Sequence, residues 1–217
     1  MKISKLHYIT QDLAHISHWE QARLACEGGA DWVQLRVKNQ NFDTWKQTAL
    51  KTQTICKAFG ATLIINDNVQ IAKEIQAEGV HLGKTDTSPI EARAILGENF
   101  IIGGTANTFE DLAFLHEAKV NYIGLGPFRF TKTKQNLSPI LGLEKYQSLL
   151  AKCKIAGLNL PIVGIGGVLL SDVEDLLLAG LHGVAVSSVI NLAEKPSEVT
   201  SDFMKALNEK YHVEHCE

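Results

Sequence analysis

The sequence predicts an α/β fold, a single (β/α)8 TIM barrel that spans residues 1–217. Three observations lead to this prediction. Short apolar segments typical of buried strands recur eight times, and amphipathic segments typical of helices separate them. The length falls at the small end of the range for such barrels. An open, doubly wound sheet is the alternative, but it would normally have fewer strands and a G-x-G-x-x-G turn after the first strand, which is absent.

The expected strands are four to six residues long and mostly rich in Ile, Val, Leu or aromatic residues. They are residues 6–10, 32–36, 62–66, 79–83, 100–104, 122–126, 161–166 and 183–187. The clearest helices are residues 42–59, 88–96 and 171–179. Ser88 followed by Pro89 predicts an N-cap and a first-turn proline, and Ser171 with Asp172 is expected to open the later helix in the same way. Three glycines fit helix ends: Gly97, Gly157 and Gly180.

The composition is that of an ordinary globular protein, with 45% apolar and 21% charged residues and a net charge of −3. This excludes bulk disorder and gives no sign of a nucleic-acid partner. No apolar run approaches the ~18 residues of a membrane span, and the N-terminus lacks the apolar core of a signal peptide. Cys26, Cys56, Cys153 and Cys216 are scattered, so we expect reduced thiols in a cytoplasmic protein. Residues 208–217 are expected to form a frayed tail.

Polar side chains follow the second expected strand. Period-two alternation places Gln34, Arg36 and Lys38 on one face together with Trp32, so that Leu35 and Val37 face the helices (residues 32–38). These polar side chains would then climb the barrel interior toward its mouth. A cation there is costly unless an anion pairs with it. The anion is either a bound ligand or an acidic side chain in an internal salt bridge.

The next strands end in further polar residues. Asp67 and Asp86 follow neighbouring strands, and carboxylates without soft ligands nearby suit Mg²⁺. Both aspartates also precede helical segments, so helix capping is the alternative. The fifth strand ends in Gly103-Gly104-Thr105, where two glycines would allow the backbone to approach a ligand.

The last three strands lead into loops suited to phosphate. Residues 126–134 offer hydroxyl and ammonium groups on Thr131, Thr133 and Lys134, although a solvated basic loop is the alternative. The long connection at residues 127–141 is expected to close over a ligand. Ser187 and Ser188 precede a short helix at the recurrent phosphate site of these barrels, where they could also act as caps.

At these residues the sequence resembles the thiamine phosphate synthase family. The motifs are Gln34-x-Arg36-x-Lys38-Asn39, Ile65-Asn66-Asp67, Gly79-Val80-His81-Leu82-Gly83-x-x-Asp86, Gly126-Pro127-Phe128, Thr131-x-Thr133-Lys134 and Ile165-Gly166-Gly167-Val168. They occur in the order of the family, and the resemblance covers about residues 6–193. Each motif alone is weak, but six at compatible spacing are specific.

The resemblance implies a transferase reaction. It joins 4-amino-2-methyl-5-hydroxymethylpyrimidine diphosphate to a thiazole phosphate by dissociative substitution and releases diphosphate. The implied binding residues for the pyrimidine diphosphate are Gln34, Arg36, Lys38, Asn66 and Lys134, with Thr105 beside the pyrimidine. Those for the thiazole phosphate are Thr131, Thr133, Gly167, Val186 and Ser187. Asp67 and Asp86 are expected to hold Mg²⁺, and Lys134, Arg36 and Thr105 to be the catalytic residues.

Two positions depart from the family pattern. Thr105 replaces the usual Ser, and Lys84 replaces a common Gln, which puts a cation near Asp86 in the sequence. Two other functions compete with the synthase. A thiazole tautomerase shares the barrel but lacks the full set of diphosphate-binding residues, and a non-catalytic binding protein for a thiamine precursor would keep the phosphate sites without turnover. The expected partners are small-molecule substrates, and the sequence leaves open whether the protein is a homo-oligomer.

Overall fold

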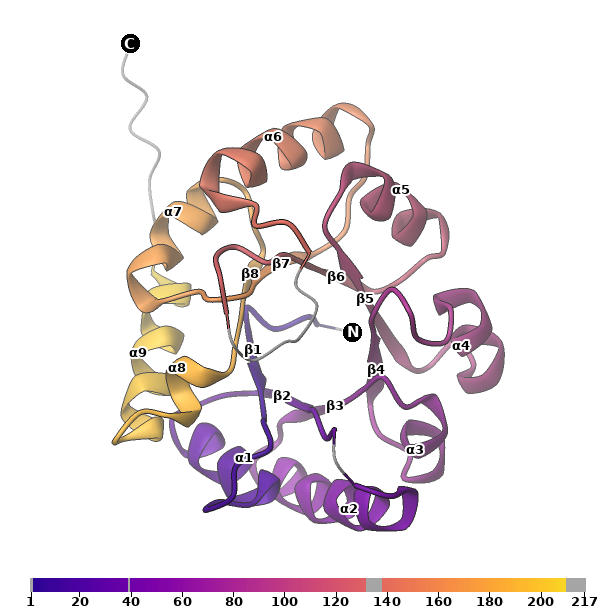
Figure 1. Cartoon of the computed structure of the whole chain (residues 1–217), viewed down its shortest axis with the longest axis vertical. Helices are drawn as coiled ribbons and strands as arrows, with labels where there is room; N and C mark the ends of the chain where they lie inside the picture. Colours follow the sequence, from indigo (N-terminus) through magenta and orange to yellow (C-terminus); the bar gives the residue numbers. More distant parts are fainter. Residues whose placement is uncertain (1, 39, 132–137, 210–217) are drawn as a thin grey trace.

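Eight parallel strands form a closed barrel in the order β1-β2-β3-β4-β5-β6-β7-β8 in the computed structural model of the chain (Figure 1). The structure describes residues 2–38, 40–131 and 138–209. The strands are β1 (Leu6–Ile9), β2 (Trp32–Leu35), β3 (Thr62–Asn66), β4 (Gly79–Leu82), β5 (Ile101–Ala106), β6 (Tyr122–Leu125), β7 (Ile162–Ile165) and β8 (Gly183–Val186). The predicted TIM barrel is confirmed and the open sheet is wrong, because β1 pairs with both β2 and β8.

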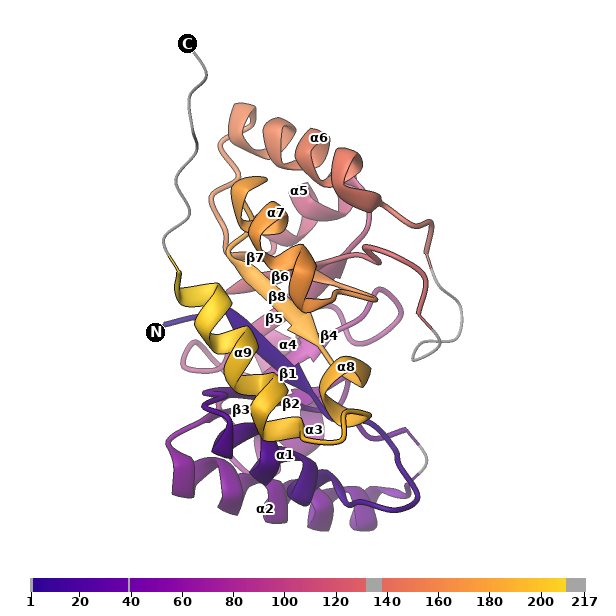
Figure 2. The same ribbon diagram turned by 90° about the vertical axis from the view of Figure 1, so that its left-hand side faces the viewer.

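Helices surround the barrel. They are α1 (His18–Glu27), α2 (Phe42–Phe59), α3 (Val69–Glu74), α4 (Pro89–Leu96), α5 (Phe109–Glu117), α6 (Gly142–Ile155), α7 (Val173–Leu178), α8 (Ser188–Asn191) and α9 (Pro196–Asn208), with a 3₁₀ turn at Leu170–Asp172. Figure 2 shows α9 crossing the outside of β1, which it contacts. Among the described residues, no helix combines the length and the apolar character that a membrane span requires.

Local sequence signals explain most helix ends. The Ser88 side chain accepts a hydrogen bond from the Glu91 N–H at 3.2 Å, and Pro89 opens α4, as predicted. The prediction for residues 171–179 was wrong at its start, because a 3₁₀ turn precedes α7 and the Asp172 side chain makes no cap bond to that helix. Asp172 instead accepts the Leu169 N–H at 2.7 Å and pairs with Arg129.

Two apolar cores lie on opposite faces of the strands. Leu35 and Val37 belong to the layer between strands and helices, whereas Trp32 belongs to the barrel interior. The predicted alternation along β2 is therefore confirmed. The rest of the interior cluster is Ile3, Ile9, Ile64, Ile101, Tyr122, Val163 and Ala185.

Aromatic rings fill the middle of the interior. His7 stacks on Trp32 with ring centroids 4.4 Å apart, and both rings meet Tyr122 edge-on. Burial, together with the nearby His81, lowers the pKa of His7 to about 3, so its ring is neutral at physiological pH. This packing fills the barrel near the amino ends of the strands. The polar side chains at the carboxyl ends of the strands therefore face the open mouth.

We expect Gly103→Ala to destabilise the protein. A Cβ at Gly103 would lie 2.2 Å from the Tyr122 ring, which the surrounding rings hold in place. Overpacking of this kind costs about 1–3 kcal/mol. Urea unfolding of the variant checks the expectation, with Gly60→Ala as a contrast because a Cβ there meets no atom within 4 Å. A change in unfolding free energy no larger than that of Gly60→Ala would contradict the packing argument. Gly60 also has φ +67, so its own cost measures backbone strain alone.

Candidate active site

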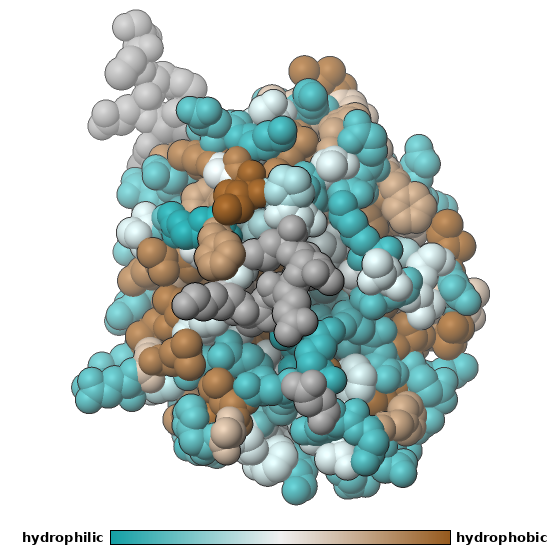
Figure 3. Space-filling model, viewed as in Figure 1, coloured by the Kyte–Doolittle hydropathy of each residue, from teal (hydrophilic) through white to brown (hydrophobic). Residues whose placement is uncertain are grey.

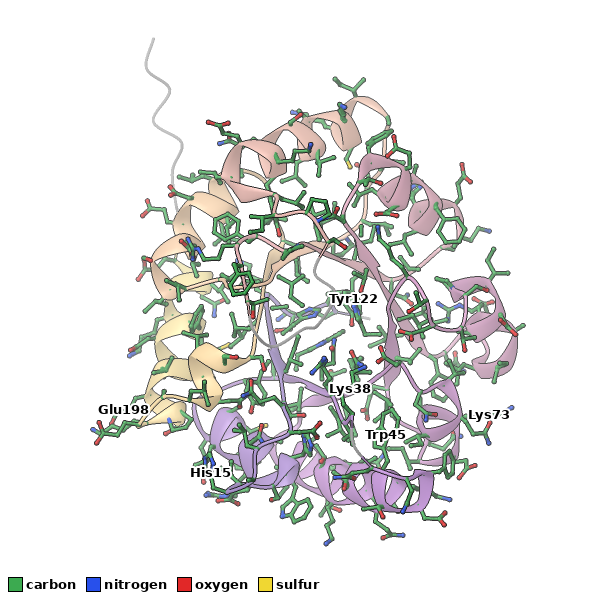
Figure 4. The ribbon with its side chains drawn as sticks, viewed as in Figure 1. His15, Lys38, Trp45, Lys73, Tyr122 and Glu198 are labelled. Carbon is green, nitrogen blue, oxygen red and sulfur yellow. The ribbon has the colours of Figure 1, made fainter. Side chains whose placement is uncertain are left out.

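The polar residues predicted on β2, β3 and β4 meet at one mouth of the barrel. Gln34 and Asn66 are buried at the ends of β2 and β3, and Arg36 is half-buried just beyond them. Figure 4 places Lys38 within the ring of strands, toward its centre, whereas Lys73 and Glu198 lie on the outside. Figure 3 shows hydrophilic residues gathered below the centre of this face of the molecule.

The two cations of this mouth, Arg36 and Lys38, differ in their side-chain contacts. The Lys38 ammonium forms an ion pair with the Asp67 carboxylate, so the alternative of an internal salt bridge holds for this residue. The Arg36 guanidinium has no hydrogen bond or ion pair with any residue that the structure describes. A half-buried cation without an acidic partner is a site for an external anion.

The carboxyl groups of Asp67 and Asp86 are close enough to change each other's pKa. Burial and the contact with Asp67 raise the pKa of the Asp86 carboxyl. Burial also acts to raise the pKa of Asp67, but its ion pair with Lys38 and the neighbouring Asp86 together outweigh burial and lower it. Two adjacent carboxyl groups are stable together when a proton or a cation lies between them.

The backbone explains why the two aspartates meet. Asp67 takes the left-handed conformation with φ 66°, and its N–H is donated to the His81 carbonyl at 2.8 Å, which continues the β3–β4 pairing past the end of β3. Asp86 folds back to accept the Gly83 N–H at 2.7 Å. The alternative that the aspartates are helix caps is wrong, since Asn68 caps α3 and Ser88 caps α4.

Lys84 lies near Asp86 in the sequence but pairs elsewhere. Its ammonium is 2.5 Å from a carboxylate oxygen of Asp111. Asp111 also accepts the backbone N–H groups of Asn107 and Thr108, and so joins the loop after β4 to the start of α5. The Lys84 departure from the family pattern is thus matched by an acidic partner outside the carboxylate pair.

Thr105 belongs to a chain of polar groups inside the barrel. Its Oγ1 is 3.0 Å from His81 Nε2, and His81 Nδ1 is 3.0 Å from the Tyr122 hydroxyl. This chain connects β4, β5 and β6, and two of its members, His81 and Tyr122, were not among the predicted site residues.

The interpretation of Gly103 and Gly104 as an opening for a ligand was wrong. The space beside Gly103 holds the Tyr122 ring, and the space beside Gly104 holds the Leu115 side chain. The glycines therefore admit neighbouring side chains of the protein. Thr105 itself is half-buried at the end of this strand.

A second polar region lies across the mouth, at β7 and β8. Gly167 has φ 69°, and the Arg129 guanidinium donates to its carbonyl at 2.9 Å while forming two bonds to Asp172 at 2.5 and 2.9 Å. The N–H of Arg129 is also donated to the Gly166 carbonyl at 2.9 Å. Arg129 therefore holds the loop after β6 against the loop after β7. The sequence analysis did not predict a role for this residue, whose one sequence signal is its charge inside the loop that is predicted to bind phosphate.

Ser187 and Ser188 do not act as side-chain caps of α8, contrary to that alternative. Both hydroxyls donate to Gln11 Oε1, at 3.0 and 3.1 Å. Asn191 Nδ2 donates to Ser187 Oγ at 3.1 Å. Val186 packs its side chain toward the helices, so it offers the mouth its backbone.

Part of the predicted phosphate loop lies outside the described residues. Thr133, Lys134 and the centre of the expected lid are not described, and neither is Cys216 near the C-terminus. Thr131 is described and is half-buried. The two described ends of the loop are joined, because Asn107 Nδ2 donates to the carbonyls of Gly126 and Pro139 at 2.9 and 3.0 Å. Closure over a ligand stays a prediction.

The family model described as thiamine monophosphate synthase matches residues 6–190. The chain belongs to this family. A thiamine-phosphate synthase of Phocaeicola vulgatus is 47% identical over 94% of this chain and 98% of its own length. One from Bacteroides fragilis is 48% identical over 90% of this chain and 96% of its own length. The family resemblance predicted from the sequence and the transferase class are confirmed.

A solved structure supports the same assignment. The thiamine phosphate pyrophosphorylase of Pyrococcus furiosus aligns with a TM-score of 0.82 at 27% identity, over 94% of this chain and 95% of that protein. The barrel and its strand order are thus shared along nearly the whole chain. The strand-end residues described above occupy the mouth of this shared barrel.

Proposed function

We propose that the protein joins 4-amino-2-methyl-5-hydroxymethylpyrimidine diphosphate to a thiazole phosphate, giving thiamine phosphate and diphosphate. The observation that carries this proposal is the half-buried Arg36 guanidinium, which has no acidic partner in the described part of the chain. It lies at the same mouth as Lys38 and the carboxyl pair of Asp67 and Asp86. Cations and acids gathered in this way suit a diphosphate and a divalent ion.

The substrates divide the mouth between them. The diphosphate lies against Arg36 and Lys38 at the end of β2, and the family resemblance adds Lys134, which is outside the described residues. Gln34, Asn66 and Thr105 take the pyrimidine. The thiazole phosphate lies on the opposite side, against Thr131, Gly167, Ser187 and the backbone of Val186. The family resemblance adds Thr133, which is also outside the described residues. This division leaves the two reacting carbon and nitrogen atoms between the anion sites.

The cationic residues act on the leaving group. As the bond from the pyrimidine methylene to the diphosphate breaks, negative charge grows on the diphosphate oxygens. Arg36, Lys38 and Lys134 stabilise that charge, and preorganised donors of this kind supply a large part of transition-state stabilisation. The thiazole nitrogen then captures the methylene cation. The step needs no general base among the described residues.

The residues present fit Mg²⁺. Asp67 and Asp86 are neighbouring carboxyl groups that affect each other's pKa, and both supply the oxygen ligands that this ion prefers. Within the described ranges no group of three or more His, Cys, Asp and Glu side chains is placed to bind a metal, so substrate oxygens and waters would complete the shell. When bound, the ion neutralises the diphosphate.

We propose a cytoplasmic setting and a single domain. Cys26, Cys56 and Cys153 are free and buried, as expected for reduced thiols. One barrel accounts for the elements from β1 to α9. Small molecules are the proposed partners, and a homo-oligomer remains compatible with the fold.

The decisive experiment mixes the purified protein with both substrates and Mg²⁺ and follows products by mass spectrometry. Thiamine phosphate and diphosphate should appear together in equal amounts, and chelation of Mg²⁺ should stop both. Isomerisation of the thiazole without diphosphate release would favour the tautomerase. Tight binding of both ligands without product in a single turnover would identify a binding protein.

A further inference from the structure

We propose that Thr10, Asp12 and His18 form a positioning network that holds the diphosphate-binding segment of Arg36 and Lys38 in place. This inference rests on the proposed function, because it takes those two cations to bind the diphosphate. None of the three residues is expected to touch substrate. They act through the backbone of the segment that follows β2.

The hydrogen-bonded pairing of β1 with β2 continues beyond the end of both strands. The Thr10 N–H is donated to the Gln34 carbonyl at 3.0 Å, in the regular manner. The next two bonds use side chains. Thr10 Oγ1 accepts the Arg36 N–H at 3.1 Å, and Asp12 Oδ2 accepts the Lys38 N–H at 3.1 Å. A regular parallel ladder would use main-chain carbonyls at these positions.

Because side chains and not main-chain carbonyls accept these two bonds, the main chains after β1 and after β2 can take different directions. The chain after β1 is free to leave the barrel toward α1, while residues 36–38 still hold a strand-like path along it. Alternate N–H groups are held, at positions 36 and 38, and the same two residues carry the cations. Because side chains alternate along an extended segment, fixing this path fixes which face both cations take.

His18 joins the two acceptors. Its Nδ1 lies 2.8 Å from Thr10 Oγ1, and its Nε2 lies 2.9 Å from Asp12 Oδ1. The residue His18 is 5% exposed at the start of α1, and Thr10 is fully buried. One consistent assignment has the Thr10 hydroxyl donate to Nδ1 and the Nε2–H donate to Asp12. Each acceptor of the Arg36 and Lys38 N–H groups is therefore itself fixed by the same imidazole.

Burial acts to lower the pKa of His18 more strongly than the contact with Asp12 acts to raise it, which agrees with a neutral ring. A neutral imidazole can donate at one nitrogen and accept at the other, as this arrangement requires. The network thus links the start of α1 to the segment that carries the two cations through the four hydrogen bonds of Thr10, Asp12 and His18. Packing alone would need none of these polar groups.

The test compares Thr10→Val with Thr10→Ser. Valine keeps the size of the buried side chain and removes the hydroxyl, whereas serine keeps the hydroxyl. We expect Thr10→Val to raise KM for the pyrimidine diphosphate about tenfold, the effect of one lost hydrogen bond. KM for the thiazole phosphate should change by less than about twofold. Thr10→Ser should restore values near those of the parent protein.

Binding of inorganic diphosphate in the presence of Mg²⁺, measured by calorimetry, gives a readout without turnover. Its Kd should rise about tenfold in Thr10→Val and stay near the parent value in Thr10→Ser. The matched control is Thr52→Val, because Thr52 is also fully buried and donates its hydroxyl to the Thr48 carbonyl at 2.9 Å within α2. It should leave both KM values and this Kd unchanged.

The outcomes separate the two proposals. If the parent protein forms no thiamine phosphate, the proposed function fails, whatever the variants do. If the parent protein is active and Thr10→Val behaves like Thr52→Val, or raises both KM values equally, the positioning network is overturned. If Thr10→Val does not fold, Asp12→Ala decides, since the Asp12 side chain is 31% exposed in a loop. The same selective rise in Kd for diphosphate supports the network, and an unchanged Kd overturns it.

Discussion

Replacing Arg36 by alanine is expected to lower kcat/KM for the pyrimidine diphosphate by about 10²–10³, the loss that follows removal of one preorganised donor to developing charge. The residue is half-buried, and its guanidinium has no acidic partner in the described part of the chain. Removing it therefore breaks no ion pair that the fold uses. The expected loss is one of function, with little change in unfolding temperature.

Two further variants sharpen this prediction. Arg36→Lys keeps the charge but loses the planar fork that binds two oxygens at once, so its activity should fall between those of the parent and Arg36→Ala. Arg23→Ala is the matched control, because Arg23 pairs with Glu20 at 2.6 Å on the outer face of α1. Normal steady-state kinetics for Arg36→Ala would remove this residue from the site. Equal losses in Arg36→Ala and Arg23→Ala would point to a general effect of charge.

The fold was predictable because the signals that specify it are local. Eight apolar segments separated by amphipathic ones indicate a repeated strand–helix unit. Eight such units in sequence close into a barrel. The helix at Phe42–Phe59 was predicted at both ends. The failure at residues 171–179 has a tertiary cause: Asp172 pairs with Arg129, which is distant in the sequence. A local capping signal cannot include that partner.

The part of the site that lies at the carboxyl ends of neighbouring strands could be predicted from the sequence. Alternation along β2 placed Arg36 and Lys38 toward the mouth, and neighbouring strand ends brought Asp67 and Asp86 together. Contacts across the barrel were not predictable in this way. The bonds from His81 to Tyr122 and to Thr105 join residues on strands whose pairing register is known only once the barrel has closed.

The two glycines of β5 also show that contacts across neighbouring strands cannot be predicted from the sequence. Gly103 and Gly104 carry one sequence signal, the absence of a side chain, and that signal does not say what fills the space. In the structure, Tyr122 and Leu115 fill it. The identity of the neighbour depends on the register between β5 and β6, in which Gly103 pairs with Tyr122. A ligand and a neighbouring ring are therefore indistinguishable from the sequence alone.

We expect Asp67→Asn to raise the Mg²⁺ concentration for half-maximal activity by about hundredfold or more, since loss of groups that merely support metal ligands already costs 10–100-fold. Asparagine keeps an oxygen but removes the charge that the ion requires. Saturating Mg²⁺ should restore part of the activity. The control is Asp202→Asn, because Asp202 lies on the exposed face of α9, 3.4 Å from Lys205. Identical Mg²⁺ titrations for Asp67→Asn and the parent protein would exclude Asp67 as a ligand.

The protons released when Mg²⁺ binds give a second test of the roles of Asp67 and Asp86. Burial and Asp67 raise the pKa of Asp86, so a proton occupies the pair over a wider pH range than an isolated aspartate would allow. Mg²⁺ must displace that proton, and the ion's affinity should therefore fall as the pH drops through the raised pKa of Asp86. Calorimetry in buffers of different ionisation enthalpy measures the protons released. In Asp67→Asn the neighbouring charge is gone, the pKa of Asp86 returns toward its usual value, and the release should shrink. An equal release from both proteins would mean that the two carboxyl groups do not share the ion.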